Sequence, residues 1–353
     1  MKAIVTADLH LKLWPDRDYD VSGLPMKLLE IISCVKQMAD YARKNSINTI
    51  IIAGDINDTK GIVSVRAFVL FRELLQRYTD INWIILHGNH DATTGSDQQE
   101  HSAIQLLEGY ENIRIILEAK TEVFDNTLVC FVPNSKNIVN VLGDVIGNMQ
   151  GDKQAILISH FGLDEAQLAS GISIRAGISA RDLTMFKLVL LGHYHTPQNL
   201  KSYETEIHYT GSPIPVRRDE AGEEKRFLVV DTDTLEVTSV PTEGYRRYIE
   251  LVLDEDTDLK EFAEQIEHYK RLNYFVIIKK NIATVPKELK DCMETTQVID
   301  NFEKDPTLRG ITSGMSPEEQ CKKYLEIIMM PEEEWEEYVK IAMEIITEAE
   351  EAT

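Results

Sequence analysis

The chain has 353 residues, of which 43% are hydrophobic and 27% charged, the composition of a globular protein with one large domain and one or two small ones. Its formal net charge of −22 argues against nonspecific nucleic-acid binding through a basic surface, so a polyanionic substrate would need bound cations and a few placed arginines. The sequence has no apolar run long enough to span a membrane, no secretory signal and no CxxC pair among its 4 cysteines, which predicts a reduced protein of the cytoplasm.

The first half of the chain alternates short apolar strands with amphipathic helices. Helices are predicted at 26–44 and 63–78, where apolar residues recur at helical spacing. Strands are predicted at 2–7, 49–53, 83–86, 127–132, 154–158 and 187–191. This alternation predicts an α/β fold, and the nearly continuous apolar strands predict sheets that are covered on both faces.

The pattern changes after Gly244. A strand, a helix and a second strand are predicted at 246–253, 259–269 and 274–279. After a linker-like stretch, Ser316 precedes a helix with a capping-box pattern, and Pro331 starts a second helix. The sequence therefore predicts four segments: a main domain at 1–244, a small α+β unit at 245–300, a linker at 301–315 and a helical tail at 316–353.

Side chains of the metal-ligand type follow five of the predicted strands within a few residues. They are Asp8 and His10, then Asp55, then Asn89, His90 and Asp91, then His160, and finally His193 and His195. The carboxyl ends of strands in an open α/β sheet form the crevice where ligands bind, so we expect these groups at one edge. Imidazole, carboxylate and amide donors without thiolate favour Mn, Fe or Zn over calcium. The set is too large for one ion, which predicts two ions about 3.5–4 Å apart bridged by a carboxylate.

A simpler interpretation applies to any one of these residues. A lone histidine at a strand end is more often a hydrogen-bonded turn residue than a ligand, and Asp and Asn after Gly are common turn formers. We interpret the remaining histidines in this way: His87, His101, His208 and His268. Five independent signals at one predicted edge favour the dimetal centre over turn chemistry.

These motifs resemble a known family. DLH, GDIND, GNHD, SH and GHYH, in this order, resemble the five signatures of the calcineurin-like metallophosphoesterases over residues 1–197. GHYHTPQ followed by TGSP and the strand FLVVDTDT resembles, more narrowly, the nuclease subunits of SbcCD-type DNA repair complexes and their bacteriophage relatives. The resemblance implies a two-sheet αββα metallophosphoesterase sandwich, a small α+β cap domain that binds DNA, and C-terminal helices.

The resemblance also implies roles for the candidate ligands. The first metal would be held by Asp8, His10 and His195, the second by Asn89, His160 and His193, and Asp55 would bridge them. Manganese is the expected metal, with Mg, Fe or Zn as alternatives. His90 would be a histidine without a metal, which protonates or stabilises the departing sugar oxygen, with Asp91 behind it as an orienting partner. Asp58 stands where some relatives carry a histidine, so we carry no exonuclease role over to it.

Candidate contacts to DNA and to a partner lie elsewhere. Arg217 and Arg218 follow TGSP, and Trp14 either stacks on a base or anchors its loop. Further candidate phosphate contacts are Lys225, Arg226, Arg246 and Arg247. Each is also explained as an ordinary solvated charge on the surface, and for Lys225 that is the better explanation. The last helix carries an apolar stripe of Trp335, Tyr338, Val339, Ile345 and Ile346. The resemblance implies that this stripe docks on the coiled-coil root of an SbcC-like ATPase, whereas the alternative is packing on its own domain. It also implies a homodimer through the helix at 63–78, whose periodicity fits a core face equally well.

The predicted function is a metal-dependent DNA endo- or exonuclease subunit of a double-strand-break repair or recombination complex, in the cytoplasm of a bacterium or a phage-infected cell. The alternative is a metallophosphoesterase acting on small-molecule phosphodiesters or phosphoproteins. Against phosphoproteins, DINDTK and GNHD lack the arginine and glutamate typical of such phosphatases. A scaffold with a decayed site is disfavoured because the ligand set is intact.

Overall fold

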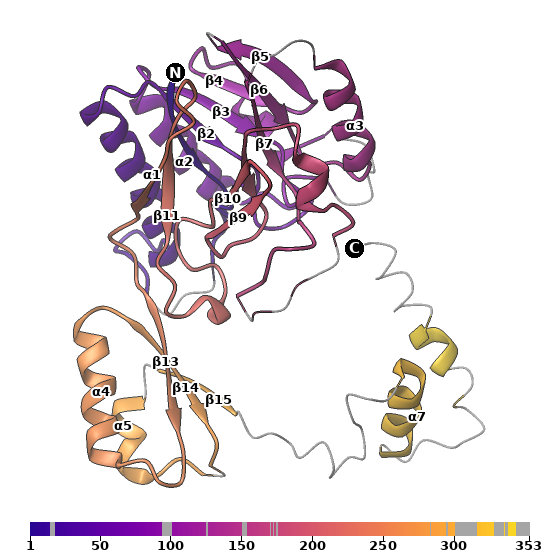
Figure 1. Cartoon of the computed structure of the whole chain (residues 1–353). Coiled ribbons are helices and arrows are strands. Elements are labelled where there is room, and N and C mark those ends of the chain that lie inside the picture. The colour runs from indigo at the N-terminus through magenta and orange to yellow at the C-terminus, as the bar shows by residue number, and fades with distance from the viewer. Residues whose placement is uncertain are drawn as a thin grey trace. The chain divides into compact units, whose positions relative to one another are not determined.

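The computed structural model describes residues 1–14, 18–93, 101–124, 126–149, 154–169, 171, 173, 176–282, 284–293, 296–300, 316–327, 335 and 338–343. The chain divides into two units, Met1–Ile249 and Glu250–Thr353. Figure 1 shows the elements of both units with their labels. The boundary lies a few residues beyond the one expected after Gly244.

The first unit contains two six-stranded sheets. In the first sheet the order is β12-β11-β1-β2-β3-β4. Its strands are β1 (Lys2–Thr6), β2 (Thr49–Ile52), β3 (Asn82–Leu86), β4 (Ile113–Ile116), β11 (Arg226–Asp231) and β12 (Val237–Pro241). β1 to β4 run parallel, whereas β11 is antiparallel to β1 and β12 to β11. The carboxyl ends of β1, β2 and β3 therefore lie at one edge.

The second sheet has the order β5-β6-β7-β8-β10-β9. Its strands are β5 (Lys120–Phe124), β6 (Thr127–Val132), β7 (Gln154–His160), β8 (Leu188–Gly192), β9 (Gln198–Ser202) and β10 (Thr205–Tyr209). The four inner strands run parallel, and the edge strands β5 and β9 are antiparallel to their neighbours. The inner strands β6, β7 and β8 are almost entirely buried because both faces of this sheet are covered.

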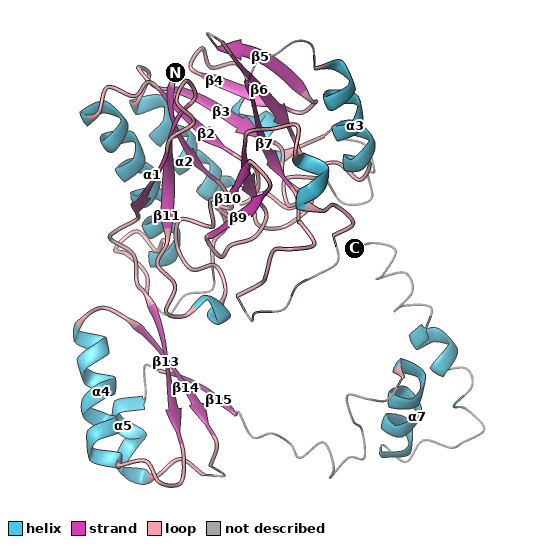
Figure 2. Cartoon of the chain, viewed as in Figure 1, coloured by secondary structure: helices cyan, strands magenta, loops and turns pink. Residues whose placement is uncertain are grey.

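Helices cover the outer faces of the two sheets. α1 (Met26–Lys44) and α2 (Val65–Arg77) connect the first three parallel strands, and α3 (Ile138–Asn148) connects β6 to β7. Short 3-10 helices are η1 (Ala103–Leu107), η2 (Ala180–Leu183) and η3 (Arg218–Glu220). In Figure 2, α1 and α2 lie on one side of the sheets and α3 lies on the other. The predicted two-sheet αββα sandwich is therefore confirmed.

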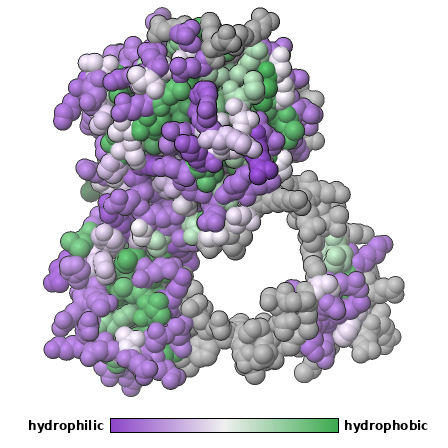
Figure 3. Space-filling model, in the orientation of Figure 1, coloured by the Kyte–Doolittle hydropathy of each residue, from purple (hydrophilic) through white to green (hydrophobic). Residues whose placement is uncertain are grey.

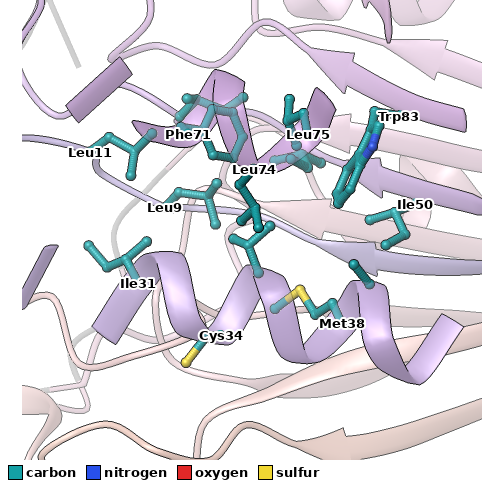
Figure 4. Close-up of a cluster of buried hydrophobic side chains, with 14 of the residues drawn as sticks. Leu9, Leu11, Ile31, Cys34, Met38, Ile50, Phe71, Leu74, Leu75 and Trp83 are labelled. Atoms are coloured by element: carbon teal, nitrogen blue, oxygen red, sulfur yellow. The ribbon is translucent and has the colours of Figure 1, made fainter. Parts of the chain in front are cut away.

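Three hydrophobic clusters form the core between these layers. Successive side chains of β1 point to opposite faces of the sheet and so belong to different clusters. Ile4 packs with α1 and α2, whereas Ala3 and Val5 face the second sheet. Figure 4 shows the first cluster, which combines Phe71, Leu74 and Leu75 of α2 with Ile31, Cys34 and Met38 of α1. A third cluster lies between the second sheet and α3. Hydrophilic side chains cover much of the face in Figure 3, in keeping with the net charge of −22.

The second unit is built on a three-stranded sheet of order β13-β14-β15. Its elements are β13 (Tyr248–Leu253), α4 (Leu259–Arg271), β14 (Phe275–Lys280), η4 (Lys287–Leu289), α5 (Lys290–Met293) and β15 (Gln297–Asp300). The Asp258 side chain caps α4 by accepting hydrogen bonds from the backbone N–H groups of Lys260 and Glu261. Phe262 and Ile266 form the buried face of this helix.

The tail contains α7 (Pro317–Ile327), and residues 335 and 338–343 are also helical. The predicted capping box of α7 is present: Ser316 N–H donates to Glu319 Oε2 (2.7 Å) and Glu319 N–H donates to Ser316 Oγ (3.2 Å). In the predicted stripe, Tyr338 is exposed and Val339 is buried. Ile345 and Ile346, and the linker at 301–315, lie outside the described residues. Among the helices described, none has the length and apolarity to cross a lipid bilayer.

Candidate metal centre

Four of the candidate ligands have a left-handed backbone, which is uncommon outside glycine. The φ angles are 57° at Asp8, 48° at His10, 55° at Asp55 and 99° at His193. Each of these residues lies just beyond the end of β1, β2 or β8. Such a conformation costs roughly 1–2 kcal/mol per residue, so surrounding contacts must hold it.

Backbone contacts hold the first two loops together. Asp8 N–H donates to Gly54 O (3.0 Å), and His10 N–H donates to Asp55 O (3.0 Å). Two glycines permit the close approach of neighbouring loops: a Cβ on Gly88 would lie 2.2 Å from Asp55 N, and one on Gly192 would lie 2.4 Å from Ala53 O. The loops after β1, β2, β3 and β8 are therefore packed closely around one point.

The side chains form two adjoining groups of donors. In the first, Nε2 of His10 lies 3.0 Å from Nε2 of His195, and a carboxylate oxygen of Asp8 lies within 4.8 Å of a nitrogen of each ring. In the second, Oδ1 of Asn89 lies 3.0 Å from Nε2 of His160 and 3.0 Å from Nδ1 of His193.

Asp55 lies between the two groups. Its Oδ2 is 3.2 Å from Nε2 of His160 and 3.8 Å from Nε2 of His10. Asp55 also shares a possible metal-binding group with Asp8 and His160, and another with His10 and His90. The structure thus brings together all seven residues expected to be ligands, with the carboxylate expected to bridge in the middle.

The residues present fit a pair of metal ions. Adjacent ligands of an octahedral ion with bonds of about 2.1 Å are separated by about 3.0 Å, which is the spacing observed between these nitrogens and oxygens. Asp8 and His160 are fully buried, and the side chains of His10 and Asp55 are almost so. Burying so many polar groups costs folding free energy unless their lone pairs accept hydrogen bonds or bind cations.

Burial and charge set the protonation of these groups. Burial lowers the pKa of His193 to about 3 and holds the pKa of His10 well below its usual value, so both rings are neutral near pH 7 and offer a lone pair. Burial opposes the charge on Asp55 and His160, but their mutual attraction is stronger. It holds the pKa of Asp55 below its usual range and raises that of His160 to about 9. A bound cation would displace the proton of His160, because a ligand imidazole must be neutral.

His90 is oriented by Asp58 rather than by Asp91. Its Nδ1 contacts the backbone carbonyl of Asp58, and its backbone N–H donates to Oδ1 of Asp55 (2.8 Å). The Asp91 carboxylate instead accepts backbone N–H groups of Asp55 (3.0 Å), Asn57 (2.8 Å) and Gly88 (2.9 Å). Burial raises the pKa of Asp91 to about 7, and the charge of Asp55 adds to this effect. Asp91 therefore fixes the loops that carry the site, which differs from the role expected for it.

The candidate DNA contacts fall in different environments. Arg217 and Arg218 are exposed, and Arg217 lines a cleft of about 180 Å³ together with Asp55, Asn89 and His90. Trp14 is half-buried and packs on the first core cluster, with the Nζ atoms of Lys12 and Lys27 at 3.7 and 3.9 Å from its ring. These contacts favour the second interpretation of Trp14, in which its ring anchors the loop, over stacking on a base.

The surface-charge interpretation of Lys225 is wrong. Its side chain has an exposed fraction of 0%, and its Nζ donates to Glu220 (2.6 Å) and Glu223 (2.7 Å). Glu220 is also buried and accepts a hydrogen bond from Nδ1 of His195 (2.9 Å). Burial would raise the pKa of Glu220, but the hydrogen bond from His195 and the charge of Lys225 lower it to about 2. This cluster was not predicted from the sequence, in which the acids and the lysine within residues 218–226 are its only signal.

Other basic residues and histidines are held by local contacts. Arg226 donates to Asn199 Oδ1 (2.8 Å), and Arg246 donates to Glu30 (2.7 Å) and Asp18 (2.8 Å). The remaining histidines are not all in turns. His87 follows β3 and contacts Ser102 Oγ (2.8 Å), and His101 is exposed, whereas His208 lies within β10 and His268 within α4. None of these four belongs to the possible metal-binding groups found among the described residues.

Comparison with known proteins agrees with this geometry. The model of the calcineurin-like phosphoesterase family matches residues 1–197, more than half of the chain. Exonuclease subunit 1 of enterobacteria phage T4 is 24% identical over 312 residues, which cover 86% of this chain and 85% of that protein. One of the subunits of the nuclease SbcCD of Bacillus subtilis is 26% identical over 269 residues, which cover 65% of this chain and 66% of that protein. A solved archaeal phosphodiesterase has 12% identity and a TM-score of 0.35, covering 68% of this chain and 99% of that one, which is too weak to bear on function.

Proposed function

Because the chain belongs to the calcineurin-like phosphoesterases, we propose that it is a metal-dependent DNA nuclease, the nuclease subunit of a double-strand-break repair or recombination complex. The observation that carries the proposal is the convergence of six donor side chains around the carboxylate of Asp55, in a cleft that also holds His90 and Arg217. The names of the two relatives, an exonuclease subunit and a subunit of a nuclease, support DNA as the substrate and another subunit as a partner.

The donors would hold two cations. One cation would be bound by Asp8, His10 and His195, the other by Asn89, His160 and His193, and both by Asp55. Two divalent cations, of which manganese suits this mixed set, supply positive charge that polarises a phosphodiester and lowers the pKa of water. The chain's own contribution is preorganisation, because strand ends and backbone hydrogen bonds fix the donors before substrate arrives.

His90 would act on the leaving group. The carbonyl of Asp58 can only accept, so Nδ1 of His90 carries the proton in that contact and Nε2 remains for the substrate. A protonated Nε2 could donate its proton to the departing sugar oxygen, and a positively charged ring would also stabilise that oxygen. Asp91 would support His90 indirectly, because it holds the backbone of Gly88 and Asp55.

The surface charge gives the proposed complex a rationale. An acidic body binds a polyanion weakly and in a salt-dependent way, so Arg217 and Arg218 would supply the few phosphate contacts near the cleft. We assign DNA binding to the unit at 245–300 as well. A coiled-coil ATPase that grips DNA would compensate for the weak binding, and the tail at 316–353 would dock on it through its apolar stripe. A homodimer through α2 belongs to the same proposal.

The test compares substrates and variants. Cleavage of end-labelled duplex DNA, supercoiled plasmid and a chromogenic phosphodiester is measured with Mn²⁺ and with EDTA, with and without the ATPase subunit. Asp55→Asn should lose manganese and DNA cleavage together. His90→Ala should keep manganese and lose cleavage by about 10²–10⁴-fold, the usual contribution of a general acid. His208→Ala is the matched control, because His208 contacts Asn199 on the edge of the second sheet and not the cleft.

Three outcomes would contradict the proposal. Hydrolysis of the chromogenic diester without cleavage of either DNA would favour the alternative phosphoesterase. Wild-type protein that takes up no manganese would remove the dimetal centre. A His90→Ala variant that cleaves DNA at the wild-type rate would remove the role of His90.

A further inference from the structure

Glu220, at the end of η3, is the acceptor at the centre of a buried group of donors. Five donor groups point at its two oxygens. Oε1 accepts from His195 Nδ1 (2.9 Å) and Arg217 N (2.9 Å), and Oε2 accepts from Lys225 Nζ (2.6 Å), Val216 N (3.0 Å) and Ser212 Oγ (3.4 Å). Its exposed fraction is 1%, so its hydrogen bonds come from the protein itself.

The contact with His195 selects one form of its ring. A carboxylate only accepts, so Nδ1 of His195 must carry the hydrogen and Nε2 must present its lone pair. That Nε2 is the atom 3.0 Å from Nε2 of His10, inside the first group of donors. We propose that Glu220, with Lys225 behind it, is a positioning residue that fixes the tautomer and orientation of His195 for one of the two metals. The inference rests on the proposed dimetal centre and adds to it a residue outside the ligand set.

Lys225 fixes the backbone of the same histidine. Its Nζ donates to the carbonyl of His195 (3.0 Å) as well as to Glu220 and Glu223. Glu220 therefore holds the ring of His195 and Lys225 holds its backbone, and these two residues form one buried ion pair. A carboxylate partner on the far nitrogen of a ligand histidine also raises the basicity of the ring toward the metal.

The same carboxylate places the arginine of the cleft. Glu220 accepts the backbone N–H of Arg217, so the segment that presents this arginine and the ring of His195 share one anchor. Displacement of the Glu220 carboxylate would disturb both. Metal binding and substrate binding would then change together rather than independently.

Glutamine at position 220 cannot replace the carboxylate in either orientation. One of its two terminal atoms is an NH₂ group, which would face either His195 and Arg217 N–H or Lys225 and Val216 N–H. Glu223→Gln is the matched control. Glu223 binds the same Lys225 and Thr196 Oγ1 (2.7 Å), and no contact joins it to the His195 ring among the described residues.

The experiment titrates metal-free full-length protein with Mn²⁺ by calorimetry and by electron paramagnetic resonance. Wild type should bind two ions and give a spin-coupled dimanganese spectrum. Glu220→Gln should bind one ion as before and the other about 10–100-fold more weakly, so the coupled spectrum gives way to that of isolated ions. Glu223→Gln should keep both ions within a few-fold. Histidine ¹⁵N spectra of the metal-free protein should show His195 protonated on Nδ1 in wild type and as a mixture of tautomers in Glu220→Gln.

A second variant guards against loss of the fold. Glu220→Asp keeps the charge beside Lys225 but withdraws the carboxylate from His195 by one methylene group, and it should weaken the same single ion. The inference is overturned if Glu220→Asp, or a folded Glu220→Gln, binds both ions as wild type does. It is also overturned if Glu223→Gln loses manganese to the same extent, since the cluster would then only stabilise the fold. A wild-type protein that binds no manganese would instead refute the proposed function.

Discussion

Substituting Gly88 with alanine perturbs the closest backbone approach in the metal centre. A Cβ at this position would lie 2.2 Å from both N and Oδ1 of Asp55, against 3.4 Å or more in ordinary contact. The loop after β3 or the loop after β2 must therefore move by about 1 Å. Gly88 does not have a positive φ, so alanine meets no dihedral penalty there and only the steric effect remains.

The expected result follows from that displacement. A shift of about 1 Å in a catalytic group costs on the order of 10²-fold in rate. Overpacking at a buried position costs about 1–3 kcal/mol of unfolding free energy. Gly88→Ala should therefore lose DNA cleavage and manganese affinity together while remaining folded.

The assay measures cleavage, manganese titration and urea unfolding for Gly88→Ala and for Gly143→Ala. Gly143 lies in α3 with no atom within 4 Å of an added Cβ. Alanine there should stabilise the protein by about 0.5–1 kcal/mol and leave cleavage unchanged. Full activity in Gly88→Ala would show that the two loops accommodate a Cβ without displacing the donors, and the steric reasoning would be wrong.

Three further results are expected from the core and the site. Phe71→Ala should lower the unfolding free energy in urea by about 3–5 kcal/mol because the ring is fully buried, whereas Val65→Ala on the exposed face of the same helix should change it by less than about 0.5 kcal/mol. Burial raises the pKa of Cys34 from 9.0 to about 12, so its thiolate is scarce up to pH 10 and iodoacetamide should label it only after unfolding; labelling of the native protein at pH 8 would contradict this. Manganese at 100 times its dissociation constant should stabilise wild type by about 2.7 kcal/mol for each of the two ions bound in thermal unfolding and Asp55→Asn far less, and equal stabilisation of both proteins would mean that the ions bind elsewhere.

The sandwich and the positions of the donors could be predicted because their signals are local. An apolar run followed by a polar residue marks the end of a buried strand, and the parallel strands then bring Asp8, Asp55 and Asn89 to one edge. The capping box at Ser316 could be predicted equally well, because its two hydrogen bonds join residues three positions apart.

The partners of buried charges could not be predicted in this way. Lys225 has the sequence context of a surface lysine, and only the tertiary structure shows that it is enclosed by Glu220, Glu223 and the carbonyl of His195. Asp91 stands next to His90 in the chain, but neighbouring side chains on a tight loop point in different directions. The Asp91 carboxylate accepts backbone amides, and His90 contacts a carbonyl instead. The partner of a buried polar group depends on which other polar groups are buried beside it when the chain folds, and this is a property of the tertiary structure.

The left-handed residues at the strand ends affect how mutants of this centre should be interpreted. Alanine at Asp8, His10, Asp55 or His193 removes a donor and also places a residue with little tolerance for positive φ in a strained loop. An alanine scan would therefore combine the loss of a metal ligand and the backbone strain in one measured change of affinity or stability. Glycine adopts a positive φ readily and has no side chain, so a glycine scan would remove each donor without straining the chain, whereas asparagine tolerates the same backbone but keeps an oxygen that can bind a metal, as proposed for Asn89.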